Sequence, residues 1–414
     1  MKLFKHLFVA AVVLTCAFMG NAQNTTSPYS AFGYGLLNDN ATSSQRALGG
    51  VGYAMQNGRQ VNAMNPASYA STDSLTFLWD IGADVSMLWS KENALKGHST
   101  GGGLDYITMQ FPISKTVGGS FGLVPFTSVG YSFGNTLDNG TESQTATGGL
   151  NQLYGGLSFR PFKGFSIGAN MSYLFGTTLY ENYLYTNTSS TSLYERIMQV
   201  RSWNLQLGIQ YAYSFNENNK ATLGLVYSPK KSLQGHTWGA KYDLTNDTRQ
   251  DTIGYSSLSG NYQTPNSYGI GLGYNYGSKI YAELDVTYQQ WKDVKYANIE
   301  GFTGNNITFD NRWKVATGLQ YTPNYRGSYA KRIQYRIGGY YNHDYINVLG
   351  NNVREYGVSI GFGLPTPSTK TLVNLGFEYK HRSTTPVSKI NENYFNITLG
   401  VTFNEMWFRK SKIY

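Results

Sequence analysis

Strict alternation of apolar and polar side chains is the feature that most restricts the fold of this chain. Between residues 75 and 87 every odd position is apolar, whereas Thr76, Asp80 and Asp84 stand at even positions. The same alternation returns in three later segments, 203–215, 280–289 and 395–403. A period of two residues is that of a β-strand with one apolar and one polar face. Such strands separate an apolar environment from a polar one.

About fourteen segments of this character predict an all-β chain. They are expected at 75–88, 104–113, 119–133, 151–159, 165–179, 200–215, 221–227, 267–276, 280–290, 313–321, 333–341, 356–364, 372–380 and 394–403. Short links (160–164, 216–220, 277–279 and 365–370) alternate with longer ones (180–199, 228–266 and 291–312). An even number of strands, with short turns at one end and long loops at the other, is typical of outer-membrane barrels.

Such strands build either a soluble β-sandwich or an outer-membrane barrel, and the amino-acid composition distinguishes between these two kinds of protein. Only 14% of the residues are charged, while 15% are aromatic. A soluble sandwich would expose large side chains such as Trp79, Trp203 and Phe377 to water, which soluble proteins avoid. Beyond the N-terminal leader, no run reaches the roughly 18 apolar residues of a membrane helix. We therefore expect a transmembrane antiparallel β-barrel surrounded by outer-membrane lipid.

The N-terminus has the features of an export signal. Two lysines precede an apolar run over residues 7–19, and small residues end at Ala22. This pattern predicts a cleaved signal peptide over residues 1–22 and the outer membrane of a Gram-negative cell as the destination. The single cysteine, Cys16, lies in this leader, so the mature chain is expected to lack disulfides and cysteine-based metal sites.

Residues 23–74 differ from the strands that follow. The stretch 45–75 is too small and polar to form its own core, and too apolar for a solvated linker. Asn65-Pro66-Ala67 within it is a turn signal. We interpret residues 23–74 as a hatch in the lumen of a barrel over residues 75–414, although an ordinary Gly-rich loop is an alternative. The expected hatch or gate residues are Gly49, Gly50, Gly52, Arg59, Asn62, Asn65, Pro66 and Ala67.

The order of these features resembles the FadL-type outer-membrane family, which takes up long-chain fatty acids and other hydrophobic compounds. The resemblance rests on the leader, the Asn-Pro-Ala turn just before the first strand, and about fourteen strands. The ending, residues 391–408, resembles endings common in outer-membrane proteins of the Bacteroidetes. The resemblance implies a lumenal hatch and a sideways exit for substrate, through a gap beside a kinked third strand.

Pro125 bears on that implied exit, because it stands in the middle of the third expected strand. Proline removes a hydrogen bond from the strand ladder. In lipid an unpaired backbone group costs several kcal/mol, so the break requires protein or water beside it. We expect a lateral opening here, with Gly122 and Gly130 allowing the strand to bend. A simple bulge in a closed wall is the alternative.

Together these features predict passive uptake of a hydrophobic small molecule through a gated lumen. The candidate substrate contacts are Phe32, Tyr34, Leu179, Tyr180, Tyr183, Leu184 and Tyr185, the last five of them in an expected outer loop. Two other functions stay open. One is a non-transporting interaction barrel, such as a type IX secretion shuttle, and the other is a hydrophilic porin.

No enzymatic activity, metal, cofactor or nucleic-acid partner is expected. The histidines after the leader, at positions 98, 236, 343 and 381, lack the spacing of metal ligands. The glycine clusters lack the Lys-Ser/Thr pair of a phosphate-binding loop. The net charge of +9 is spread along the chain without a basic run. The sequence leaves the solute and the oligomeric state open, and a monomer is compatible with it.

Overall fold

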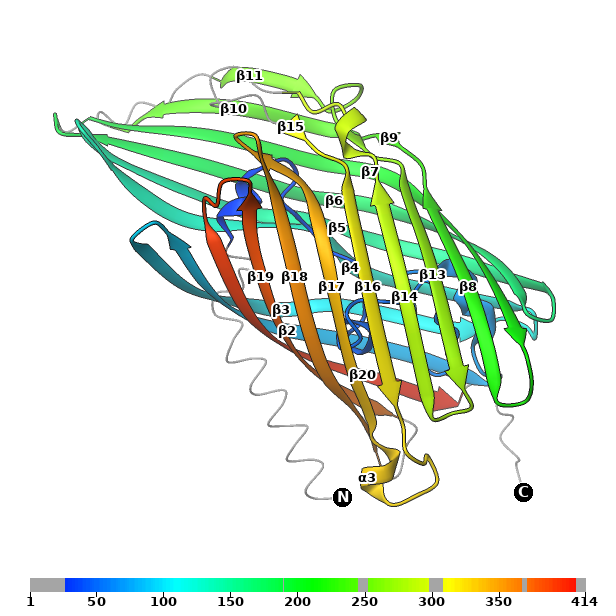
Figure 1. The fold of residues 1–414 in the computed structure, drawn as a ribbon. Coiled ribbons are helices and arrows are strands. Elements are labelled where there is room, and N and C mark those ends of the chain that lie inside the picture. The colour runs from blue at the N-terminus through cyan, green and yellow to red at the C-terminus, as the bar shows by residue number, and fades with distance from the viewer. Residues whose placement is uncertain (1–26, 189, 245–251, 298–307, 367–370, 407–414) are drawn as a thin grey trace, which may run out of the picture.

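The computed structural model describes residues 27–188, 190–244, 252–297, 308–366 and 371–406. Within these residues, fourteen long strands form one closed antiparallel barrel (Figure 1). In order round the wall they are β2 (Thr76–Glu92), β3 (Leu95–Pro112), β4 (Val117–Leu137), β5 (Gly140–Phe162), β6 (Phe165–Thr186), β7 (Thr191–Ser214), β8 (Asn219–Ser228), β13 (Ser267–Tyr276), β14 (Ile280–Gln289), β16 (Arg312–Tyr321), β17 (Gln334–Val348), β18 (Asn351–Pro365), β19 (Leu372–Thr385) and β20 (Asn391–Met406).

The wall closes where β20 pairs with β2, from Thr76 opposite Met406 to Lys91 opposite Asn391. The expected barrel of about fourteen strands is therefore confirmed. The expected signal peptide, residues 1–22, lies outside the described residues.

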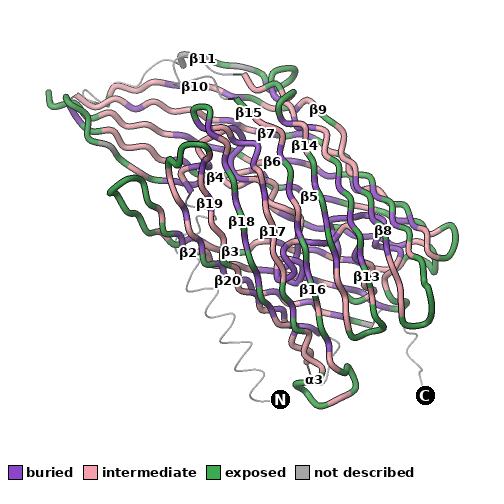
Figure 2. Tube along the Cα trace, in the orientation of Figure 1, coloured by how far each residue is buried: buried purple, intermediate pink, exposed green. Residues whose placement is uncertain are grey.

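The alternation in sequence becomes an alternation of environment. On β7, Trp203, Leu205 and Leu207 are exposed on the outer face, whereas Ser202 and Gln210 are buried inside. Figure 2 shows buried and exposed residues alternating along the strands of the wall. Because adjacent strand residues point to opposite faces, one sequence pattern supplies both the lipid-facing surface and the lumen lining. None of the helices in the described residues is long and apolar enough to cross a membrane.

The two ends of the barrel differ. At one end, the described turns are short, apart from the β16–β17 turn, which contains α3 (Tyr329–Arg332) and lies at the bottom of Figure 1. In outer-membrane barrels this is the periplasmic end. The other end, here called the outer end, adds β9 (Lys231–Ser232), β10 (Gly235–Asp243), β11 (Thr252–Ser257), β12 (Gln263–Thr264), η4 (Trp291–Asp293) and β15 (Thr308–Phe309).

One expected outer loop is instead an extended hairpin. The segment 180–199, expected to be a long loop, continues β6 as far as Thr186 and β7 from Thr191. The loop prediction was wrong because it relied on an alternation of apolar and polar residues. The parts of β6 and β7 that rise beyond the membrane do not need an apolar outer face, so they lack this alternation. In this raised part β7 pairs with β10, while β8 pairs only with its inner part, from Leu207 onward.

The N-terminal segment passes through the lumen and is here called the plug (blue in Figure 1). It contains η2 (Pro28–Ala31), β1 (Leu36–Leu37), α2 (Ser43–Arg46) and η3 (Pro66–Ser71). The Asn65 side chain accepts a hydrogen bond from the Ala67 backbone N–H, and Pro66 occupies the first turn of η3. Both are standard ways of starting a helix. Because the described part of this segment lies inside the closed barrel, the expected position of the plug in the lumen is confirmed.

Candidate functional site

The barrel wall contains a break between β3 and β4. These strands pair only from Ile107 opposite Leu123 to Pro112 opposite Gly118. Toward the outer end, residues 95–106 of β3 pair only with β2, and residues 124–137 of β4 have no pairing with β3. A bulge lies in each strand where the two diverge, since the β2–β3 register skips Asp105 and the β4–β5 register skips Phe126.

The three residues expected at a kink surround this break. Gly122 is the next-to-last residue of β4 paired with β3, opposite Thr108. Pro125 follows within the diverging part, next to the Phe126 bulge, and Gly130 lies further toward the outer end. Pro125 therefore lies at the point of divergence, and the lateral opening expected there stays a prediction. Proline alone does not account for it, because the bulge at Asp105 bends the opposite strand as well.

The plug occupies the exposed edge of β4. Strand β1 pairs Leu36 with Ser128 and Leu37 with Thr127. The Asn38 backbone N–H donates to the Phe126 carbonyl over 3.0 Å. The Ser30 hydroxyl accepts a hydrogen bond from the Gly130 N–H over 3.0 Å, and its O–H lies within donating distance of the carbonyls of Ser27 (2.6 Å) and Gly130 (3.1 Å). Backbone groups on an open edge would otherwise lack partners, so the plug completes the wall where β3 leaves it.

The same part of the plug reaches the edge of β3. Arg46 forms an ion pair of 2.6 Å with Asp105, the bulged residue of β3. The Ser43 backbone N–H donates to the hydroxyl of Tyr106 over 2.8 Å. Residues 28–46 therefore bridge both sides of the break, and we call them the gap segment.

An ionic clamp between a partly exposed carboxylate and two buried cations holds the middle of the gap segment. The Asp39 carboxylate contacts Lys314 at 2.5 Å and Arg312 at 3.2 Å, both on the inner face of β16. Burial alone would raise the pKa of Asp39, but the Lys314 ammonium and the Arg312 guanidinium hold it well below its usual value. Asp39 is therefore ionised at neutral pH and attached to the wall opposite the break.

An apolar cluster fills the outer part of the lumen around the first residues of the gap segment. Tyr34 is buried and packs its ring against Tyr296 at 5.1 Å and Trp291 at 5.8 Å. Phe32 is partly buried against the same cluster. Its members, here called the outer aromatic cluster, include Tyr29, Tyr34, Leu150, Leu174, Met198, Val200, Tyr262, Trp291, Phe309 and Tyr345.

The rest of the plug, residues 47–72, is held by steric fit, and we call it the wedged segment. At several points where the backbone of the wedged segment touches the wall, the wall residue is a glycine. A Cβ on Gly224 would lie 1.9 Å from the Tyr53 carbonyl oxygen, and one on Gly168 would lie 2.5 Å from the Pro66 carbonyl carbon. Gly49 is itself pressed against β16 and β17, with a φ of +75° that favours glycine.

Buried hydrogen bonds add to this fit. The Asn62 amide donates to the carbonyls of Gly52 and Met55, and its oxygen accepts from the Gln45 side chain and the Met64 backbone. The Gly52 N–H donates to the Asp285 carboxylate over 2.7 Å. Gly50 has a φ of +82°, and Ala67 is fully buried. Arg59 differs from the other expected hatch residues, because it is exposed and paired only with Asp73, at 3.0 Å.

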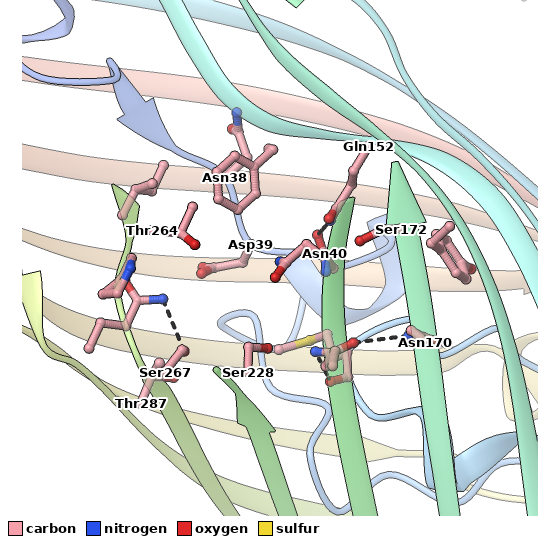
Figure 3. A pocket seen from close by; sticks show the side chains of 18 of the residues that line it. Asn38, Asp39, Asn40, Gln152, Asn170, Ser172, Ser228, Thr264, Ser267 and Thr287 are labelled. Carbon is pink, nitrogen blue, oxygen red and sulfur yellow. Dashed lines mark hydrogen bonds between the residues drawn. The ribbon is translucent and has the colours of Figure 1, made fainter. Parts of the chain in front are cut away.

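Two cavities beside the plug, within the lumen, are small and mostly polar. One of about 120 Å³ is lined by Asn38, Asn40, Gln152 and Asn170, among others (Figure 3). A second, of about 160 Å³, has a charged lining that includes Arg46, Lys314, Asp344, Glu355, Glu378, Lys380 and Arg382. These linings do not match an apolar solute, whereas the side chains of the outer aromatic cluster are mostly apolar. The described residues contain no group of three His, Cys, Asp or Glu side chains suited to a metal ion.

The candidate substrate contacts on β6 are divided between its two faces. Tyr180 is buried, with the Arg196 guanidinium 4.1 Å above its ring, and packs with Val129 and Tyr131 of β4. By strand alternation Leu184 shares its face, while Leu179, Tyr183 and Tyr185 point the other way. These residues lie on a strand rather than in the loop expected from the sequence. Of the five, Tyr180 packs against the diverging part of β4.

Sequence reasoning missed the residues that attach the gap segment. Arg312 and Lys314 carried a signal, because they stand two residues apart and so share one face of a membrane strand. Charges on the inner face of such a strand need a partner in the lumen. Ser30 and Asn38 carried no comparable signal, since short polar residues are common in any loop.

Comparison with known proteins finds one family that matches the chain and several transporters with the same fold. The family model described as BamG matches residues 3–414. The structure is similar to a FadL homologue of Pseudomonas aeruginosa (TM-score 0.64, 14% identity, covering 89% of this chain and 99% of that one). It is also similar to the toluene transporter TodX of P. putida (0.61, 14%, 90% and 100%) and to the toluene transporter TbuX of Ralstonia pickettii (0.57, 12%, 88% and 98%). At such identities the likeness establishes the fold alone. No curated protein sequence matches the chain.

Proposed function

The chain belongs to the BamG family, and we propose that it carries a hydrophobic small molecule across the outer membrane, with the gap segment as its gate. The fold supports this proposal, because the barrel is similar to those of transporters for hydrophobic compounds. The observation that carries this proposal is the pairing of β1 with β4 in place of β3. Part of the wall consists of plug backbone, so a shift of the plug opens the wall without unfolding the barrel.

The proposed route begins at the outer aromatic cluster and ends at the break. Apolar side chains at the outer end provide the first contacts, and the buried Tyr131 and Tyr180 lie beside β4 on the lumen side. Leu104 of β3 and Leu123 of β4 are exposed on the lipid-facing surface beside the break. An apolar solute prefers the bilayer to water, so a sideways exit is favourable. Such a route bypasses the charged cavity deeper in the lumen.

Replacing residues 28–41 with a Gly/Ser linker of equal length tests the proposed gate. The prediction is a rise in uptake of a hydrophobic probe, such as radiolabelled oleate or toluene, by about tenfold, because the wall then stays open. Permeability to a large polar antibiotic should change little, since the wedged segment still blocks the lumen. Unchanged uptake of the hydrophobic probe by a correctly folded variant would rule out the gate.

A second function, a non-transporting barrel that holds partner proteins, is favoured by a different observation. The inner lumen is filled by a plug with many buried bonds, and its remaining cavities are polar. Uptake by cells with and without the protein separates the two functions. Equal uptake, together with co-purification of a stoichiometric partner, would support the holding function. The same filled lumen argues against a hydrophilic porin.

A further inference from the structure

A third cavity opens at the periplasmic end and belongs to neither the break nor the outer aromatic cluster. It has a volume of about 580 Å³ and lies between plug residues 55–60 and the turns that join β13 to β14 and β16 to β17. We call it the periplasmic groove. One wall is the plug itself, so the barrel wall separates this part of the groove from bilayer lipid.

The lining of the periplasmic groove is positively charged. It includes Arg59, Lys279 and Arg326, and no Asp or Glu. Arg59 is neutralised by Asp73 at the rim. Lys279 and Arg326 are exposed, and neither takes part in a salt bridge within the described part of the chain. The β16–β17 turn adds Lys331, also exposed, and residues 322–336 contain no acidic residue.

Two further groups in the groove are suited to binding a peptide. Gln60 is only 3% exposed, and its side-chain Nε2 has no hydrogen-bond partner among the described residues. A buried amide donor without an acceptor costs about 1–3 kcal/mol, which a carbonyl or carboxylate oxygen from a ligand would offset. Tyr325 is 53% exposed and stacks beside the Arg326 guanidinium, 5.1 Å from its ring centre. It offers an apolar surface next to the charges.

We propose that the periplasmic groove binds an extended acidic segment of a periplasmic protein. Lys279 and Arg326 pair with its carboxylates, Gln60 donates to an oxygen of the segment, and Tyr325 packs against its side chains. This proposal does not depend on transport. It requires only that the plug and the two turns keep the positions seen here.

Binding of a fluorescein-labelled octaglutamate peptide to the full-length protein in detergent tests the proposal. Octalysine and octaserine peptides serve as probe controls. The double variant Lys279→Glu/Arg326→Glu should weaken octaglutamate binding at least tenfold. The matched control, Lys91→Glu/Lys96→Glu, reverses two exposed lysines paired across the β2–β3 hairpin at the outer end and should leave binding unchanged.

A second variant, Gln60→Leu, removes the unpartnered donor without changing charge and should weaken binding about threefold. Heat-modifiable migration on gels confirms that each variant is folded. Equal octaglutamate affinity in the wild type and the Lys279/Arg326 variant would overturn the proposal. So would binding of phosphatidylglycerol vesicles without binding of octaglutamate, because the basic surface would then serve the membrane.

Discussion

The gap segment and the wedged segment are neighbours in one plug, yet they are held in different ways. The wedged segment lies against wall glycines such as Gly224 and Gly168, where even one methyl group would collide with its backbone. The gap segment is held by the edge of β4, by the clamp at Asp39 and by the ion pair of Arg46 with Asp105. Hydrogen bonds and ion pairs of this kind can be exchanged for others, whereas steric fit cannot.

This difference bears on which part of the plug would move in the proposed gate. A displaced wedged segment would leave the wall side chains of Asp285 and Gln210 without the hydrogen bonds that they form with Gly52 and Tyr53 of the plug. Each buried unsatisfied group costs about 1–3 kcal/mol. A displaced gap segment would expose one strand edge at a break that already exists, and it would release ion pairs whose charged groups can take new partners in the charged cavity beside them. We therefore assign the gate to residues 28–46 and a fixed structural role to residues 47–72.

The largest effect is expected from crowding the wedged segment. Gly224→Ala places a methyl group 1.9 Å from the Tyr53 carbonyl oxygen. Overpacking typically costs about 1–3 kcal/mol and occasionally more, and we expect at least the upper end of that range because the neighbouring atom belongs to the backbone and cannot rotate away. The variant should show a marked loss of the heat-modifiable folded form, or cleavage of the plug by thermolysin. The control, Gly155→Ala, adds the same methyl group where nothing lies within 4 Å. Equal behaviour of the two variants would show that the fit is loose.

A smaller effect is expected from releasing the ionic clamp. Asp39→Asn leaves Lys314 and Arg312 without their carboxylate, at a cost of about 2 kcal/mol because Asp39 is partly exposed. Hydrogen–deuterium exchange should rise in residues 28–46 and stay unchanged in 47–72. Asp73→Asn, which removes the exposed partner of Arg59, is the matched control and should change neither region. A uniform rise across the whole plug would contradict the distinction between its two parts.

The smallest effect is expected at Pro125. Pro125→Thr restores one N–H on β4, but the bulges at Phe126 and Asp105 keep the strands apart. Uptake of a hydrophobic probe should fall by less than about twofold, with a stability change below about 1 kcal/mol. Pro112→Thr, at the paired inner end of β3, is the control. Complete loss of uptake in the Pro125 variant would mean that proline alone sets the opening.

The sequence predicted the membrane part of the wall well because lipid imposes alternation there. Strand β13, expected at residues 267–276, has exactly those bounds as Ser267–Tyr276. Strand β7 was expected from residue 200 but begins at Thr191, because its outer part rises above the lipid and pairs with β10. Pro125 marked where β4 diverges from β3.

The attachment of the plug to the wall could not be predicted from the sequence, for a physical reason. Strand β1 has only two residues, and its partner β4 lies about ninety residues away, so no local pattern announces it. Asp39 and Arg312 are likewise brought together only by the closed barrel. The turn at Asn65 and Pro66 was visible in the sequence, because capping depends on neighbouring residues alone.

A reversible disulfide tests most directly whether the gap segment is the gate. Leu36→Cys/Ser128→Cys joins paired residues of β1 and β4, and the only native cysteine, Cys16, lies in the expected signal peptide and is replaced by Ala in both variants. The control, Ala54→Cys/Gly273→Cys, locks the wedged segment, where the Cβ atoms would lie about 3.2 Å apart. We predict that oxidation stops hydrophobic probe uptake in the first variant, that reductant restores it, and that the second variant is unaffected. Full uptake with the gap segment cross-linked to β4 would contradict the account.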